Sequence, residues 1–347
     1  MSGVRQHFIP RFLQKGFRIP SNGKTVRSWV YEHGRPPRPA NIADVGLERY
    51  FYAIDAETEL DDKITEAEQH FYAPLVDRLR EGSVDAGDVG LIAEMLVHFE
   101  VRSRHVRQNM DSLFDDCTTQ LVGYLSDPQT LALLIEGHLK PGSEIFDGEL
   151  EKLNISYDQM QCIFSTQGIT LQDVLRPWIS AYAARIGNAL PTFRSQITNM
   201  VKQTHLRILT QSVSPAARAE RLTSLKYTVR DYDSGDLPLG DAIVLFHVKG
   251  ERAFKPFLDK DDEVIHVVLP LSSHQYLLGA SDDAQEELTY DLAEQVVACS
   301  MRYFIARSDQ LTHLQATIGS KAHWISQAEA KSIMESVVRE LLPKSIG

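Results

Sequence analysis

The sequence predicts an α+β fold, with a predominantly helical body and short strands from the N-terminal and C-terminal regions. Two observations lead to this prediction. Apolar residues recur at helical spacing through the middle of the chain, and short alternating or apolar runs occur toward both ends. We therefore divide the chain into residues 1–58, 59–214 and 215–347. With 347 residues, 43% of them hydrophobic, the chain is long enough for one large core, and we expect one integrated domain.

The first stretch is predicted to hold a terminal motif and short strands. The pair Asn22-Gly23 is typical of a turn, and residues 26–31 after it predict a strand. The proline-rich run at residues 35–39 continues neither a helix nor a central strand. Aromatic residues make residues 48–54 a second candidate strand.

The helical body begins with a helix that Asp61 and Asp62 can cap and that runs toward Leu79. Pro74 predicts a kink in this helix because proline lacks a backbone N–H. A second helix follows Asp88, which is a suitable N-cap. Its apolar positions at helical spacing are Ile92, Met95, Leu96, Phe99, Val106, Met110 and Leu113. Further helices are predicted at residues 127–137, 156–164, 171–187 and 191–211.

After residue 215 the hydrophobic period changes from helical to strand-like. The predicted strands are residues 225–232, 241–248, 264–269 and 275–278. Two helices, at residues 284–307 and 326–342, are predicted to close this strand-rich segment.

Charge and composition restrict the class of protein. A net charge of -11 argues against broad adhesion to nucleic acid or anionic lipid, but it leaves room for a local basic cleft. The three cysteines form no CxxC pair, so neither a disulfide framework nor a thiolate zinc site is indicated. The N-terminus does not resemble a signal peptide, and no run of about 18 apolar residues occurs. We expect a cytoplasmic protein with no membrane partner.

Several nucleotide and hydrolase signatures are absent from the sequence. It contains no P-loop, no GxGxxG after a predicted strand and no GxSxG elbow. Nucleotide-driven motors, dehydrogenases of the Rossmann type and α/β hydrolases are therefore disfavoured.

The second predicted helix carries the densest set of polar residues. Four polar residues share one face of this helix, because they follow one another at intervals of four, four and three residues: Glu94, His98, Arg102 and His105. Arg104 and Arg107 lie on neighbouring faces. An arginine can bind a carboxylate or phosphate with two parallel hydrogen bonds, and Arg102 would suit that role. The alternative is an ion-paired, solvated helix face without a ligand.

The N-terminal run HFIPRFLQKGF is the most distinctive segment. Histidine exchanges a proton near neutral pH, so a fixed His7 would be able to act as general acid or base. The alternative is that His7 hydrogen-bonds the backbone while the apolar residues dock a terminal segment.

This run resembles the opening motif of the bacterial domain-of-unknown-function family DUF4238, which begins with His-x-x-Pro, an apolar run and a phenylalanine. The chain matches at His7, Pro10, Leu13 and Phe17. The resemblance follows the family's order of segments through nearly the whole chain, and the opening motif is its specific part. Because the family has no settled activity, the resemblance implies a fold more than a function.

Three further family positions have counterparts here. The resemblance implies a glutamate on the first helix, which corresponds to Glu68, and an arginine segment, which corresponds to Arg102 with Arg107 downstream. It also implies a late Ser-Asp-Asn-Pro segment. Asp241 is kept there, but Gly240 replaces the serine and Ala-Ile replaces Asn-Pro.

These observations lead to a first functional hypothesis, an enzyme acting on a phosphate-containing substrate. Its concrete form is a nuclease-like or nucleotide-processing toxin or defence protein, whose partner is a nucleic acid or nucleotide. The catalytic candidates are His7, Glu68, Arg102 and Asp241, and the substrate-binding candidates are Arg104, His105 and Arg107. His7 would be the acid or base and Arg102 would hold the anion. Glu68 and Asp241 would orient the others or share a divalent metal.

The hypothesis requires these side chains to converge in one pocket. The alternative is a non-catalytic binding, immunity or sensor module with a protein partner. In that case the histidine and arginines would be paired internally, with no open cleft beside them. A third possibility is a structural role, in which the N-terminal motif only locks the fold.

Overall fold

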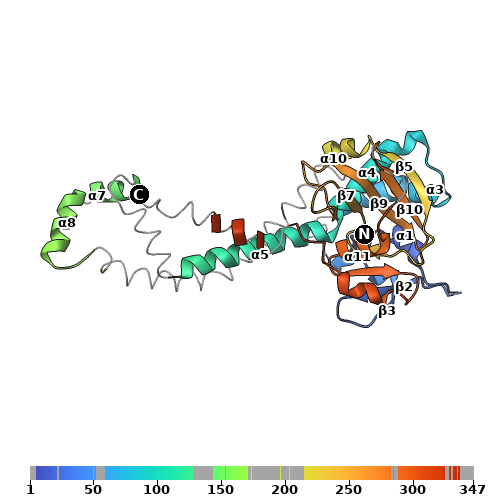
Figure 1. The fold of residues 1–347 in the computed structure, drawn as a ribbon, viewed down its shortest axis with the longest axis horizontal. Coiled ribbons are helices and arrows are strands. Elements are labelled where there is room, and N and C mark those ends of the chain that lie inside the picture. The colour runs from blue at the N-terminus through green and yellow to red at the C-terminus, as the bar shows by residue number, and fades with distance from the viewer. Residues whose placement is uncertain are drawn as a thin grey trace. The chain divides into compact units, whose positions relative to one another are not determined.

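The computed structural model confirms the α+β class (Figure 1). It describes residues 5–21, 23–49, 51, 59–127, 144–152, 154–170, 215–282 and 288–324, with isolated positions 173, 196, 203 and 284 and short pieces between 328 and 336. Its strands form three antiparallel sheets in this part of the chain. The expected predominance of helix is not confirmed.

Spatial contacts divide the chain into two compact units. The first unit comprises residues 1–109 and 201–324, and the second comprises residues 110–200 and 325–347. This division follows contacts in space, whereas the three predicted stretches follow the order of elements along the chain. The predicted boundaries and the expected single integrated domain stay predictions.

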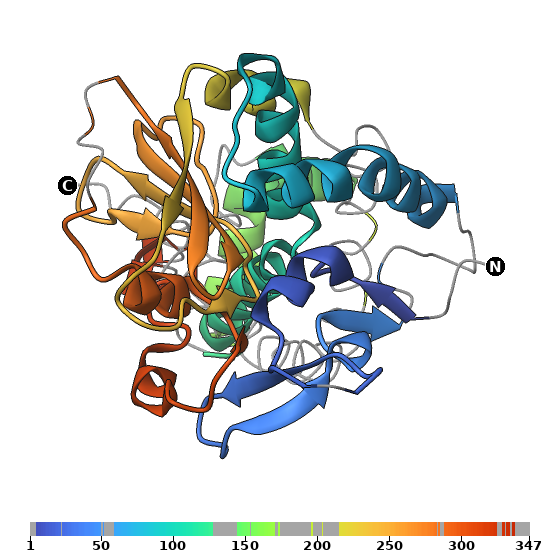
Figure 2. The same ribbon diagram turned by 90° about the vertical axis from the view of Figure 1, so that its right-hand side faces the viewer.

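A five-stranded antiparallel sheet is the centre of the first unit. Its strand order is β5 (Lys226–Asp231), β10 (Gln275–Ala280), β9 (Val264–Ser272), β7 (Leu245–Val248) and β8 (Phe254–Lys255). Alternate residues of β9 enter different core clusters, because Val267 and Leu269 pack with the helices of the N-terminal half while Val268 packs with the C-terminal helix α11 (Leu292–Cys299). Both faces are therefore covered, as Figure 2 shows. The predicted strands at 225–232, 264–269 and 275–278 are confirmed.

The second sheet joins the two ends of the first unit. Its order is β3 (Arg38–Asn41), β2 (Arg27–Glu32), β11 (Tyr303–Ala306) and β6 (Leu239–Gly240). The prediction of one helix over residues 284–307 was wrong, because α11 ends at Cys299 and β11 follows as a central strand. A short apolar run fits a buried helix as well as a buried strand, and here the run pairs with β2.

A two-stranded sheet fixes the N-terminal motif. It pairs β1 (Arg5–His7) with β4 (Leu47–Arg49), and His7 lies opposite Leu47. The predicted strand at 48–54 is thus confirmed only at its start, since residue 50 and residues 52–58 lie outside the described residues.

The first helical segment contains a π-helical turn. It comprises α2 (Glu59–Ala67), a π-helical turn η3 (Glu68–Tyr72) and α3 (Ala73–Arg80), with Pro74 at the start of α3. The Ala73 N–H donates to the Glu68 carbonyl, five residues back, which is the hydrogen bond of a π turn. The predicted interruption at Pro74 therefore takes the form of a widened turn just before the proline.

The second predicted helix is broken. α4 (Val89–Arg102) ends where Ser103 adopts an extended conformation, with ψ of 154°, and α5 (Arg104–Ser126) begins at the next residue. The Ser103 hydroxyl donates to the Glu100 carbonyl at 2.8 Å. His105 therefore belongs to a different helix from Arg102, and the prediction that they share one helical face was wrong.

The other elements are short or belong to the second unit. They are α1 (Arg11–Gln14), η1 (Lys15–Phe17), η2 (Ile42–Asp44), η4 (Ala86–Asp88), α7 (Glu144–Lys152), α8 (Tyr157–Thr166), α10 (Ala216–Leu222) and η5 (Thr312–Thr317). The predicted helix at 156–164 is confirmed as α8, which starts with a Ser156 capping box. The predicted helices at 127–137, 171–187, 191–211 and 326–342 lie largely or wholly outside the described residues. No helix in the described ranges is long and apolar enough to cross a membrane.

Candidate functional site

The N-terminal motif separates its apolar side chains from its polar ones. Phe8, Ile9, Leu13 and Phe17 are at most 1% exposed and belong to the main hydrophobic cluster. Gln14 is also buried, and its side-chain N–H groups donate to the carbonyls of Ile9 and Val45 at 2.9 and 3.1 Å. The motif thus docks the terminal segment, as one alternative expected, while its charged residues stay outside the core.

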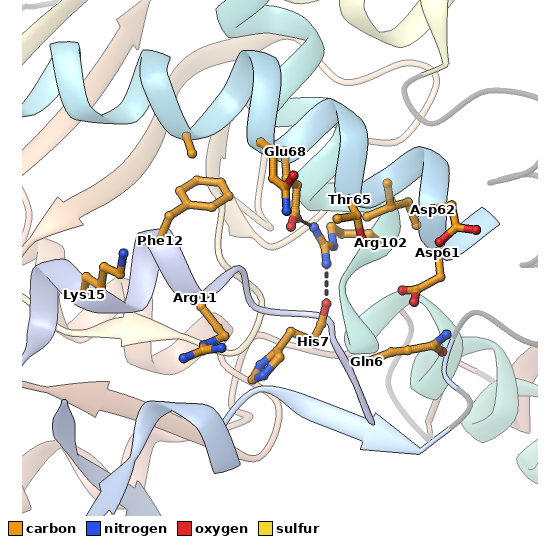
Figure 3. A pocket seen from close by; sticks show the side chains of 13 residues that line it. Gln6, His7, Arg11, Phe12, Lys15, Asp61, Asp62, Thr65, Glu68 and Arg102 are labelled. Carbon is orange, nitrogen blue, oxygen red and sulfur yellow. Dashed lines mark hydrogen bonds and ion pairs between the residues drawn. The ribbon is translucent and has the colours of Figure 1, made fainter. Parts of the chain in front are cut away.

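Beside this segment lies a cavity of about 730 Å³, which we call the first cavity (Figure 3). It brings together three predicted catalytic residues, His7 from β1, Glu68 from the π turn and Arg102 from the end of α4. The other lining residues are Gln6, Arg11, Phe12, Lys15, Asp61, Asp62, Ile64, Thr65, Gln69 and Ala73. The convergence that the enzyme hypothesis required is therefore present for three of its residues.

Arg102 is a buried cation whose donors are turned to protein groups. Its side chain is 1% exposed and forms an ion pair with the Glu68 carboxylate. It also donates to the His7 carbonyl, which the dashed line in Figure 3 marks, and lies 3.1 Å from His98 Nε2. A buried charge needs such partners to offset its desolvation. Arg102 therefore ties β1, the π turn and α4 together.

The π turn explains how Glu68 reaches this arginine. A π turn widens the helix locally, and such turns are frequent at functional sites. Glu68 is the first residue of the turn, its side chain is 17% exposed, and Oε1 lies 3.8 Å from His98 Nε2. The carboxylate thus faces both Arg102 and the cavity.

The His7 ring is held in one tautomer. Its Nδ1 lies 3.1 Å from the Val45 carbonyl oxygen, which can only accept a hydrogen bond. In the neutral ring Nδ1 therefore carries the hydrogen, and Nε2 is the nitrogen that accepts a proton. With its main-chain oxygen bound by Arg102, His7 is fixed through both main chain and side chain.

The cavity also contains charged residues that the sequence prediction missed. Asp61 lies in it, and burial raises the pKa of this carboxyl although Gln6 donates a hydrogen bond to it and Arg102 is nearby. Arg11 and Lys15 are exposed cations in the same cavity. Their spacing of four residues within the motif is the signal that would have found them, because it places both on one side of a helical turn.

Asp241 is not one of the residues that line the first cavity. It is 2% exposed and accepts hydrogen bonds from the main-chain N–H groups of Met301 and Arg302 at 2.7 and 2.9 Å. Burial raises the pKa of Asp241 to about 6, and these hydrogen bonds partly oppose the rise. The predicted catalytic aspartate instead stabilises the turn between α11 and β11.

A shared metal site with Glu68 receives no support from this arrangement. Within the described ranges, no group of three or more His, Cys, Asp or Glu side chains is placed to hold a metal ion.

The three predicted substrate-binding residues also lie away from the first cavity, because α4 ends before them. Arg104 Nε lies 3.4 Å from Glu48 Oε2. Arg107 donates to the Phe51 carbonyl at 2.7 Å, and its guanidinium lies 4.1 Å from the Phe51 ring centroid. His105 is 1% exposed and hydrogen-bonds with the Ser103 hydroxyl. These contacts are structural.

Comparison with curated proteins and with solved structures gave no match. The family model described as "Protein of unknown function (DUF4238)" matches residues 5–333, nearly the whole chain and all the residues of the first cavity. The resemblance carried by the N-terminal motif is thereby confirmed, and the chain belongs to the DUF4238 family.

Proposed function

We propose that the first cavity is the active site of a cytoplasmic hydrolase that acts on a phosphate-containing substrate. The observation that carries the proposal is the convergence of His7, Glu68 and Arg102, from three separate segments, on one open cavity. A nuclease-like or nucleotide-processing toxin or defence protein is its concrete form, with a nucleic acid or nucleotide as partner.

In this proposal His7 is the general base. Its Nε2 removes a proton from water, the water oxygen attacks phosphorus, and the bond from phosphorus to the leaving oxygen breaks. Asp61 protonates that oxygen, a role that the raised pKa of its carboxyl favours. Arg11 and Lys15 bind the anion, since both line the cavity and are exposed. Arg102 and Glu68 position His7 rather than touch the substrate.

The non-catalytic alternative has an observation of its own. The donors of Arg102 point to Glu68, His98 and the His7 carbonyl, and Asp241 bonds main-chain groups elsewhere. Internal pairing of this kind is what a binding, immunity or sensor module with a protein partner would show. The open cavity beside the pair favours the enzyme.

Turnover by a His7→Gln variant tests the proposal. Wild type and variant are incubated with RNA, DNA and nucleotides, with and without magnesium or manganese, while circular dichroism monitors folding. We expect at least a 100-fold loss of turnover in a folded His7→Gln protein, because general bases typically contribute that much. His33→Gln is the matched control, since His33 is exposed in the turn after β2. If wild type turns nothing over, the binding-module alternative replaces the enzyme.

A further inference from the structure

A second cavity, of about 760 Å³, shares Lys15 with the first and has a different chemistry. Among the described residues, four cationic side chains and no carboxylate line it: Lys15, Arg18, Arg80 and Arg307. They come from η1, the residue after it, the end of α3 and the residue after β11. Segments remote in sequence therefore concentrate positive charge in one hollow of a protein whose net charge is -11.

Most of this charge is not neutralised by the protein. Within the described residues, Lys15, Arg18 and Arg307 form no ion pair. Two contacts join lining residues to acidic side chains in the described ranges: Asp77 Oδ1 lies 3.5 Å from Arg80, and Asp231 lies 3.4 Å from Gln275. A pocket of like charges costs stability unless an anion occupies it.

Arg80 contributes charge but few free donors. It donates to the carbonyls of Phe12, Leu13 and Leu271, and it also faces Asp77. Burial lowers the pKa of Arg80, Asp77 raises it, and the positive charge of Arg18 lowers it further. Because arginine stays protonated, Arg80 adds a fixed positive charge to the lining. Arg18 and Arg307 are exposed and able to donate hydrogen bonds to a ligand.

Neutral donors complete the lining. Ser272 and Ser273 are 6% and 1% exposed, and Ser273 Oγ lies 3.3 Å from His274 Nδ1. The hydroxyls add uncharged hydrogen-bonding groups beside the cations, and the His274 ring adds a further one. In the described part of the chain, no phenylalanine, tyrosine or tryptophan on which a base could stack lines this cavity.

We propose that the second cavity binds a polyanion that carries two or more phosphate groups and is recognised through those phosphates. Arginine pairs with phosphate oxygens through two parallel hydrogen bonds, and several cations around one hollow favour a multiply charged ligand over a single phosphate. The proposal is independent of catalysis in the first cavity. It concerns Arg18 and Arg307, which do not line the first cavity.

The test is calorimetric titration of the full chain with tripolyphosphate, with ATP and with a short single-stranded RNA. The Arg18→Gln/Arg307→Gln double variant should raise the Kd for tripolyphosphate at least tenfold, because two charge-assisted contacts are lost. Arg35→Gln/Arg38→Gln removes two exposed arginines that pair with Glu32 outside the cavity, and it should leave the Kd unchanged. Circular dichroism verifies that both variants fold.

The arms distinguish the sources of phosphate. Similar Kd values for tripolyphosphate and ATP would support recognition through the phosphates, whereas much tighter binding of ATP would overturn it, because the nucleoside would then supply the recognition. Three further outcomes would overturn the proposal. Wild type binds no polyphosphate at millimolar concentration, it binds RNA alone, or the Arg18→Gln/Arg307→Gln variant keeps the wild-type Kd. His7→Gln should bind tripolyphosphate like wild type, so failure here is separable from failure of the proposed hydrolase.

Discussion

The two cavities of the first unit share Lys15 but treat charge in opposite ways. In the first cavity, Glu68, Asp61 and Asp62 accompany Arg102 and His7, and the buried cation is fully engaged by protein groups. In the second cavity, cations gather with no carboxylate among the described lining residues. The first arrangement can fix tautomers and shift pKa values, whereas the second can attract an anion. The paired charges of the first cavity fit the proton transfer that we propose there, and the mostly unpaired cations of the second fit the anion binding that we propose.

The N-terminal motif forms part of both cavities. Its apolar residues are buried in the core, and its charged residues lie at the surface on short helical turns. His7 and Arg11 face the first cavity, Arg18 faces the second, and Lys15 faces both.

Arg102→Ala should cause the largest effect. It leaves the Glu68 carboxylate without its buried partner and releases the His7 carbonyl, so we expect a loss of about 3–5 kcal/mol in the free energy of unfolding. Chemical denaturation measures it. Arg11→Ala, at an exposed arginine of the same cavity, is the control and should stay within about 0.5 kcal/mol of wild type. Equal stability of the two variants would contradict the distinction between structural and ligand-facing cations.

Asp241 should show its structural role through pH. The pKa of this carboxyl is about 6 in the folded protein and 3.8 for an unperturbed group, so the folded state binds the proton more tightly. Protonated Asp241 therefore adds about 3 kcal/mol to the free energy of unfolding. This contribution is fully present below pH 3.8 and is lost as the pH rises through 6. The measurement is the free energy of unfolding of wild type and Asp241→Asn from pH 4 to pH 7. Parallel curves for the two proteins would refute the assignment.

Gly16→Ala should disturb the contact between η1 and β9 in the lining of the second cavity. A Cβ at Gly16 would collide with the Leu271 carbonyl oxygen and come within 2.7 Å of Arg80 Nη2, so η1 must move away from β9. We expect a loss of about 1–3 kcal/mol in the free energy of unfolding, as for other overpacked sites. Gly87→Ala is the control because a Cβ there meets nothing within 4 Å. If both variants melt like wild type, the close approach of Gly16 to the Leu271 carbonyl does not stabilise the fold.

Local patterns predicted the strands β2, β5, β9 and β10. Their residues form apolar runs, or runs in which apolar and polar residues alternate, with turn residues on either side. They did not predict the break at Ser103, where no glycine or proline interrupts the helix. At the break, Ser103 is extended and its hydroxyl donates to the Glu100 carbonyl. The break also explains why Arg104, His105 and Arg107 are not part of the predicted site.

The first cavity was partly predictable and the second was not. His7, Glu68 and Arg102 follow from the motif and the family's order of segments, and the structure brings them together. Arg18, Arg80 and Arg307 belong to no local pattern, since only the pairing of β11 and the packing of η1 on β9 bring them into one hollow. Charge that accumulates through tertiary structure leaves no signature in a single sequence.

Lys15→Gln should give the smallest effect, and it separates shared from independent cavities. Lys15 is exposed and forms no ion pair within the described residues, so its loss removes one flexible contact from each cavity. We expect about a threefold rise in the Kd for tripolyphosphate and about a threefold fall in turnover, with unchanged stability. Lys24→Gln, which removes an exposed lysine that lines neither cavity, is the control. A change in only one of the two quantities would show that Lys15 serves one cavity, and the two sites would then be independent.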